Sequence, residues 1–302
     1  MKNLREVLQR KKGFDVNLGE EFQRNLLQNF KVLNLYNESD VFPYEILKQI
    51  PSIEKLVVCD GSFKEIFYCQ SPNNVDYSGV VSQLKVLHLK SLKDLISIVS
   101  DNSLAETFLR NLETLQVNSC SSLINLVKCR VPFFNLTYLK VENCGSLTYL
   151  FTSSTAKNLV QLKRMEIENC KSIEEIVSKE VVEESNDDEI TFPHLSWMNL
   201  ESLRNLRRFY KGSLSFSSLE KLSIITCPSM ETLCLGTVKA DNLSQVIVGM
   251  PVETIPLEIN LNSTLRKTFL TKVCVLMYIV MILLLYLNVI KSFLFPSNNI
   301  LF

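Results

Sequence analysis

The sequence predicts an α/β repeat solenoid, and three observations lead to this fold class. The first is a recurring pattern of apolar residues, whose clearest copy is Leu112, Leu115, Val117, Cys120, Leu123 and Leu126. The second is that 302 residues at 46% hydrophobic can bury a large core. The third is that glycine is scarce, at 8 residues, and neither GxxxxGK[ST] nor GxGxxG occurs. The sequence therefore gives no indication of a nucleotide-binding α/β fold.

The spacing within one copy indicates how the chain is arranged. Leu115 and Val117 alternate with period two, so both side chains point to one face of a short strand. The next apolar residues are three apart, which suits a turn and an irregular or short helical return. Cys120 lies where the chain leaves the strand, and there a small side chain can be buried with its weak S–H donor near backbone acceptors. One such unit cannot bury its apolar face alone, but stacked units form a continuous core.

Six copies of this pattern are in register. Four contain the cysteine, with strand centres at 115–117, 139–141, 165–167 and 222–224, and two at 87–89 and 198–200 lack it. Weaker copies surround Val58 and Val246, and the first candidate strand is 30–35. The repeats therefore predict a curved leucine-rich-repeat horseshoe with a parallel concave β-sheet of about eight or nine strands, about 35 Å long. Its convex side is expected to be irregular or short-helical.

The repeat boundaries divide the chain into five segments. Residues 1–29 are an N-terminal cap or a truncated preceding segment, and 30–250 are the leucine-rich-repeat domain. Residues 251–272 form a C-terminal flank, 273–290 a candidate transmembrane helix, and 291–302 a short tail.

The charge balance, the N-terminal residues and the cysteine usage together predict a cytoplasmic protein that does not bind nucleic acid. Lysine plus arginine balance aspartate plus glutamate at 32 each, so the sequence gives no reason to expect nucleic acid as a partner. No apolar stretch separates Lys2 from Arg10, as a secretory signal would require. Without secretion, the nine cysteines are expected to be reduced thiols.

The segment 273–290 is eighteen residues long and contains one polar residue, Asn288, so it has the length of a short transmembrane helix. Arg266, Lys267 and Lys272 precede it and Lys291 follows, a bias that would keep the repeats in the cytosol with a membrane tether at the C-terminus. The alternative is that the segment is not an evolved anchor and derives from altered 3′ coding sequence. Both interpretations stay open at this stage.

The concave face is the candidate binding surface, because solenoids recognise partners there and exposed faces of rigid scaffolds carry function. The side chains expected to point outward from it are His88, Lys90, Gln116, Asn118, Lys140, Glu142, Glu166, Glu168, Asn199, Glu201, Ser223 and Ile225. The sequence predicts that these residues contact a protein partner.

The histidines, the repeat cysteines and the acidic run are better explained by structural roles than by catalysis or metal binding. The chain has two histidines, His88 and His194, and no arrangement that indicates a nucleophile and base, so we expect no enzyme. The repeat cysteines would lie in a row, which is wrong for tetrahedral zinc, so no metal or cofactor is expected. The acidic run at 180–189 lacks the residue order of an EF-hand and is expected to be a solvated loop.

Several phrases point to a family. LTYLKVENCGSL at 136–147, LKRMEIENCKSIEEI at 162–176, FPHL at 192–195 and LRNLRRF at 203–209 resemble the C-terminal repeats of plant NB-ARC–LRR disease-resistance proteins of the coiled-coil type. The resemblance covers about 30–272 and implies a role in plant defence. It implies three kinds of protein partner: a pathogen effector, a guarded host protein, or a receptor's nucleotide-binding domain.

The family's nucleotide-binding switch has no counterpart in this sequence, so its ATP binding does not carry over. Three interpretations of this chain stay open: it is a fragment of such a receptor, a truncated paralogue, or a partner that acts with another protein. An alternative function is a generic adaptor or scaffold, such as the substrate-recognition subunit of a ubiquitin ligase. Residues 1–28 show no convincing docking motif for that role.

Overall fold

The computed structural model describes residues 29–36, 50, 52–67, 83–99, 108–127, 131–179, 189–249, 252–257 and 260–294. Most of the segment expected at 1–29 and most of the acidic run at 180–189 lie outside these residues. In the helix α6 (Leu261–Leu294), the side chains at 270, 272–280 and 288–294 also lie outside the description.

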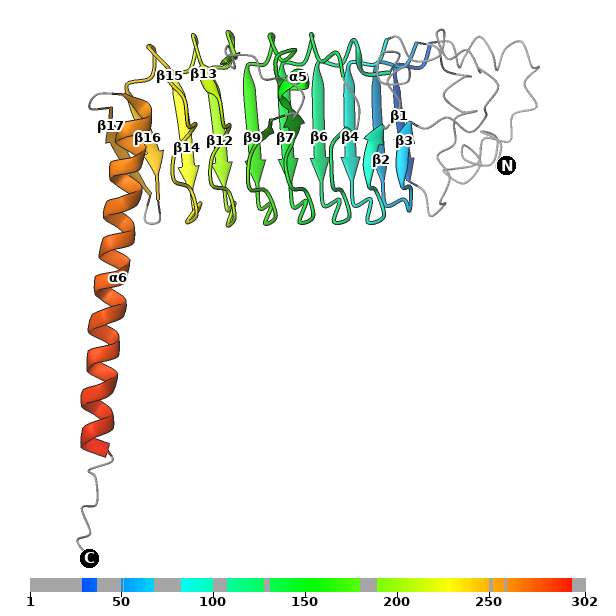
Figure 1. Ribbon diagram of the computed structural model, residues 1–302. Helices are drawn as coiled ribbons and strands as arrows, with labels where there is room; N and C mark the ends of the chain where they lie inside the picture. The colour runs from blue at the N-terminus through cyan, green and yellow to red at the C-terminus, as the bar shows by residue number, and fades with distance from the viewer. Residues whose placement is uncertain are drawn as a thin grey trace, which may run out of the picture.

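The architecture is a stack of coils whose main strands form one ten-stranded sheet (Figure 1). In sheet order the strands are β1 (Val32–Tyr36), β2 (Lys55–Cys59), β4 (Val86–Lys90), β6 (Thr114–Asn118), β7 (Tyr138–Glu142), β9 (Arg164–Glu168), β12 (Trp197–Glu201), β14 (Lys221–Ile225), β16 (Gln245–Val248) and β17 (Glu253–Pro256). The pairings from β1 to β16 are all parallel, and that from β16 to β17 is antiparallel. The predicted parallel repeat solenoid is confirmed, with one further, antiparallel strand at its end.

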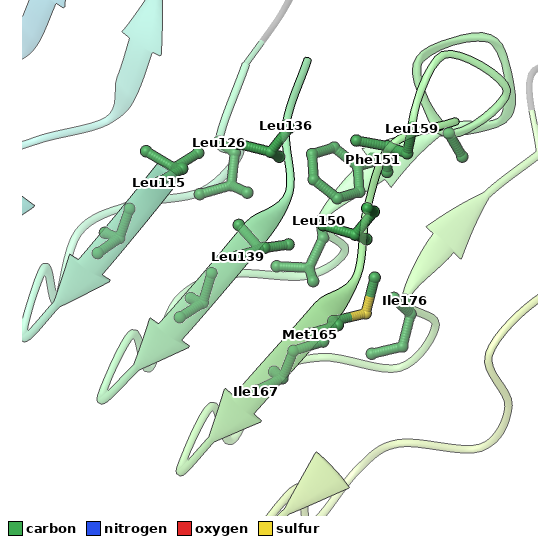
Figure 2. Close-up of a cluster of buried hydrophobic side chains, with 14 of the residues drawn as sticks. Leu115, Leu126, Leu136, Leu139, Leu150, Phe151, Leu159, Met165, Ile167 and Ile176 are labelled. Carbon is green, nitrogen blue, oxygen red and sulfur yellow. The ribbon is translucent and has the colours of Figure 1, made fainter. Parts of the chain in front are cut away.

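Strand register follows the repeat. Leu115 pairs with Leu139, and Leu139 with Met165, so equivalent residues of neighbouring coils stand side by side. The strand-centre residues Val117, Val141, Ile167 and Ile224 are at most 1% exposed, as the period-two alternation predicts. Figure 2 shows Leu139 and Met165 facing Leu150 and Ile176 of the returning segments, with the apolar core between them.

The return side contains more strand than expected. Its elements are β3 (Glu65–Phe67), β5 (Ser97–Val99), β8 (Phe151–Thr152), β10 (Val177–Ser178), β11 (Glu189–Thr191), β13 (Ser213–Ser215), β15 (Val238–Lys239) and the four-residue helix α5 (Ser153–Ala156). These strands pair in parallel in three small sheets. Aromatic and β-branched residues such as Phe67, Ile98 and Val99 favour extended backbone, which explains the difference from the irregular or short-helical return predicted.

One residue after the main strand turns the chain in seven coils. Asp60, Ser91, Ser119, Asn143, Asn169, Ser202 and Thr226 have φ between 52° and 57°, although none is glycine. In each of the first six, the backbone N–H donates to the carbonyl of the last residue of the next main strand, at 2.9–3.1 Å. This bond satisfies a backbone group that the sharp turn would otherwise leave unpaired.

The repeat cysteines lie inside this turn, as predicted. Their thiols donate to the carbonyl two residues earlier, at 3.6 Å for Cys120, 3.4 Å for Cys144, 3.3 Å for Cys170 and 3.4 Å for Cys227. All four are free and buried. Burial raises the pKa of Cys227 to about 12, because the charged thiolate is disfavoured away from water. The row therefore acts as a set of small, weakly polar core residues.

A different arrangement closes the C-terminal end of the stack. Leu261 and Leu265, in the first turns of α6, are at most 2% exposed. Between them, the Asn262 amide oxygen accepts from the backbone N–H of Leu233 (3.1 Å) and Cys234 (3.4 Å), and its nitrogen donates to the Cys234 carbonyl (3.1 Å). Asn262 thus pairs backbone groups that a further coil would have paired.

Helix α6 continues from this end beyond the sheet (Figure 1). From Met281 to Leu287 its side chains are exposed. In the part of the chain that the structure describes, no helix is both long enough and apolar enough to cross a membrane. The transmembrane helix expected at 273–290 is therefore not supported.

Candidate recognition surface

The expected concave surface corresponds to the outer face of the main sheet, here called the sheet face. It is formed by the first, third and fifth residues of strands β4, β6, β7, β9, β12 and β14, because the second and fourth residues point into the core. The first-position row is Val86, Thr114, Tyr138, Arg164, Trp197 and Lys221. The third-position row is His88, Gln116, Lys140, Glu166, Asn199 and Ser223, and the fifth-position row is Lys90, Asn118, Glu142, Glu168, Glu201 and Ile225.

All twelve residues predicted for the surface therefore occupy the third and fifth rows and lie next to one another. Three of them are less accessible than expected: Glu166, Asn199 and Ser223 are 5%, 9% and 6% exposed. Glu166 contacts the larger Tyr138 and Arg164 of the first-position row. These three residues therefore offer a partner little accessible surface.

Lys140 lies among three carboxylates from its own and the next strand. Its ammonium nitrogen is 3.4 Å from Glu142, 3.8 Å from Glu166 and 3.3 Å from Glu168. Partial burial opposes the charged ammonium, but the carboxylates of Glu168 and Glu142 outweigh it and raise the pKa of Lys140 above its usual value. Lys140 is therefore a charged, centrally held residue of the face.

Buried Glu166 is matched by three donors. The Tyr138 hydroxyl donates to it at 3.0 Å, the Arg164 guanidinium forms an ion pair with it, and Lys140 completes the set. Burial, and then the hydrogen bond to Glu166, raises the pKa of Tyr138. A buried carboxylate is tolerated when it is paired and hydrogen-bonded in this way.

The fifth-position row contains three carboxylates on adjacent strands, Glu142, Glu168 and Glu201. Asn118 donates to Glu142 at 2.9 Å, and Asn199 donates to both Glu168 and Glu201 at 3.4 Å. These amides fix the carboxylates without neutralising them. Among the described residues, Lys140 is the one cation that pairs with Glu142 and Glu168, so the row keeps an excess of negative charge.

The first-position row was missed by the sequence analysis. Here the Trp197 ring lies between two cations, with the Arg164 guanidinium carbon 3.4 Å from the ring centroid and the Lys221 ammonium nitrogen 5.7 Å from it. Cations above an indole ring are attracted by its π electrons. The period-two alternation, extended one step before the first core residue of each strand, places Tyr138, Arg164, Trp197 and Lys221 on the sheet face.

The β4 end of the face differs in charge. His88 is half-buried, and burial followed by the nearby Lys55 lowers the pKa of His88, so its neutral form is favoured. Lys90 is exposed beside it in the fifth-position row. His88 and His194 are not brought together, since β6, β7 and β9 separate their coils. Among the described residues, no group of three histidine, cysteine or acidic side chains is placed to hold a metal ion.

A shallow groove of about 490 Å³ borders the first-position row. It is lined by Gln83, Lys85, Asn111, Glu113, Asn135, Thr137 and Gln161, all from the segments that lead into the strands.

The opposite, return side carries a separate ion-pair network in which Arg208 joins Glu175 at 3.3 Å and Glu231 at 3.7 Å. Glu189, the one described residue of the acidic run, begins β11 and pairs with Lys239 at 2.9 Å.

Comparison with known proteins places this geometry in a biological context. A family model for the leucine-rich repeats of plant disease resistance proteins similar to RPS2 matches residues 2–133, 128–171 and 162–246. "Disease resistance protein RPS5" of Arabidopsis thaliana is 30% identical over 105 residues, 35% of this chain and 12% of the relative. "Probable disease resistance protein At5g63020" of the same plant is 23% identical over 191 residues, 63% of this chain and 19% of the relative.

A third relative comes from another plant. A putative late blight resistance protein homolog of Solanum demissum is 29% identical over 92 residues, 30% of this chain and 6% of the relative. The chain thus aligns with less than a fifth of the length of each of these relatives.

Proposed function

Because the chain belongs to the RPS2-like leucine-rich-repeat family of plant disease resistance proteins, we propose that its sheet face recognises a protein during plant defence. The partner is a pathogen effector, a host protein that effectors modify, or the nucleotide-binding domain of a resistance protein that the repeats restrain. Binding requires no catalysis by this chain.

The observation that carries the proposal is the ordered polar network on the sheet face. Lys140, Glu142, Glu168, Asn199 and Glu201 come from three adjacent strands and hold one another in place. A surface that is rigid before binding loses less side-chain entropy when a partner docks. Solubility alone requires polar residues, but it does not require that they be fixed by cross-strand contacts.

Site-specific photo-crosslinking in plant cells tests the proposal. A photoreactive amino acid replaces exposed Lys90 on the sheet face or, as a matched control, exposed Arg207 on the return segment. We expect a discrete protein adduct from position 90 that is absent from position 207 and is lost when Lys140→Glu is added. An adduct seen only in infected tissue supports sensing, whereas an adduct with a nucleotide-binding resistance protein supports restraint.

Two results would contradict recognition by this face. One is equal adducts from positions 90 and 207, and the other is an adduct from position 207 alone. Thermal unfolding of the Lys140→Glu variant shows whether a lost adduct reflects a lost surface or a lost fold.

A further inference from the structure

Over strands β7 to β14, the first- and fifth-position rows of the sheet face carry charges of opposite sign. The fifth-position row has Glu142, Glu168 and Glu201 on β7, β9 and β12. The first-position row has Arg164 and Lys221 on either side of Trp197, on β9, β12 and β14. The first and fifth positions are four residue steps apart along an extended strand, which corresponds to about 13 Å. An α-helix with its side chains is about 10–12 Å wide, so one helix fills the space between the two rows.

The spacing within the acidic row distinguishes a helix from an extended segment as the occupant. Its three carboxylates are on neighbouring strands, so they step by about 4.8 Å and span about 9.6 Å. On a helix, residues i and i+7 lie about 10.5 Å apart along the axis, with i+3 or i+4 between them. Same-side residues of a strand would span about 13 Å over two steps. The mismatch is about 1 Å for a helix and roughly 3 Å or more for a strand.

We propose that the sheet face over β7, β9 and β12 docks an α-helix of a protein partner. The helix runs across the strands and presents basic residues at i, i+3 or i+4, and i+7 to Glu142, Glu168 and Glu201. Its opposite edge carries acidic side chains, or side chains with a planar group, and meets Lys221 and Trp197. This inference rests on the proposed function and specifies the chemistry of the partner at that surface.

The contacts on the face explain why the carboxylates are available to such a helix. Asn118 and Asn199 orient them through neutral amides, and Lys140 can balance one of the three charges in the row. Glu166, by contrast, is buried and already paired with Arg164 and Tyr138, so it contributes no free charge. The negative charge available to the basic edge of the helix therefore comes from the fifth-position row.

Trp197 makes the test direct, because it is the one tryptophan of the chain. The full chain is titrated at low salt with two alanine-rich helical peptides of equal composition. In the edge peptide, three lysines occupy i, i+4 and i+7; in the scattered peptide, they are spread around the helix. Dissociation constants come from the anisotropy of a peptide label, and Trp197 emission reports whether the peptide lies on the sheet face.

We expect the edge peptide to bind at least tenfold more tightly than the scattered peptide and to change Trp197 emission. The combined substitution Glu142→Gln, Glu168→Gln and Glu201→Gln should weaken binding at least tenfold, since it keeps the shape and removes the charge. Glu113→Gln, an exposed carboxylate outside the face, is the matched control and should leave binding unchanged. Replacing the edge lysines by glutamates should abolish binding while leaving the protein unaltered.

Equal binding of the two isomers, binding that survives the triple substitution, or no binding of either peptide would overturn the helix proposal. The crosslinking experiment separates this outcome from failure of the proposed function. An adduct at position 90 without peptide binding leaves recognition standing and rejects the helical, basic partner. Loss of both results rejects both proposals.

Discussion

Strand β9 lies between β7 and β12 and pairs with a parallel neighbour on each side, whereas β16 has one parallel neighbour and the antiparallel β17 on its other side. In the middle of the stack, equivalent residues of successive coils pair with one another in register, so many similar contacts contribute to stability. At the C-terminal end, one side chain outside the repeat, Asn262, pairs with the backbone of the return segment that follows β14. Repetition stabilises the first region and a specific contact stabilises the second.

The largest expected effect tests the middle region. Ile167→Ala removes a fully buried side chain of β9 and should destabilise the fold by about 2–4 kcal/mol, because both apolar burial and packing are lost. Denaturant unfolding measures the change, with exposed Lys171→Ala as the control. An unchanged unfolding midpoint in Ile167→Ala would show that this residue does not face the core.

The next effect tests the C-terminal end. Asn262→Ala leaves the N–H groups of Leu233 and Cys234 and the Cys234 carbonyl without this partner. We expect a loss of about 1–3 kcal/mol, together with faster hydrogen exchange at Leu233 and Cys234 than in the middle of the stack. Thr271→Ala, an exposed residue of the same helix, is the control. Unchanged exchange at these two amides would argue against a capping role.

A smaller effect is expected on the sheet face. Lys140→Met removes the cation among Glu142, Glu166 and Glu168 and should cost about 1–2 kcal/mol, between the values for exposed and buried ion pairs. Because the folded-state pKa of Lys140 is raised, its contribution is complete below the ordinary lysine pKa of 10.5 and is lost as the pH rises through the folded value. The difference between wild type and variant should therefore shrink above pH 10.5, and a constant difference would rule out a charge effect.

The smallest effect compares the same turn in the two regions. Thr226 directly follows β14 with φ 54°, and Asn143 directly follows β7 with φ 57°. A β-branched residue is strained in the left-handed region, whereas asparagine tolerates it. Thr226→Asn should stabilise by about 0.5–1 kcal/mol and Asn143→Thr should destabilise by a similar amount. Melting temperatures that shift in the same direction for both variants would contradict this explanation.

The repeat was predictable because each coil places an apolar residue in the same register as its neighbours, and a pattern repeated many times is not obscured by local variation. The strand β17 was not, because Glu253–Pro256 matches no repeat and its pairing depends on β16 being the last parallel strand. Asn262 was missed for the same reason. Its role depends on unpaired groups around Cys234 that are distant in sequence.

The candidate surface was predictable in position and less so in detail. Alternation placed His88 and Glu142 correctly on the sheet face, but it could not show that neighbouring side chains bury Glu166 to 5% exposure. Burial on a sheet face depends on the sizes of the residues on neighbouring strands. The contact between Arg164 and Trp197 could have been predicted from the strand register, since both residues are first in their strands and the two strands are paired.

The left-handed turn residue has a consequence for how such genes change. In six coils its N–H donates to the next coil in the same way, so each junction between coils presents the same donors and acceptors. Unequal crossing-over that adds or deletes one whole coil between β4 and β14 therefore creates a junction of an existing kind. The length of the sheet face can change by one strand, about 4.8 Å, at each such event while the C-terminal closure around Asn262 is inherited unaltered. Recombination can vary the reach of the binding surface without having to evolve a new fold.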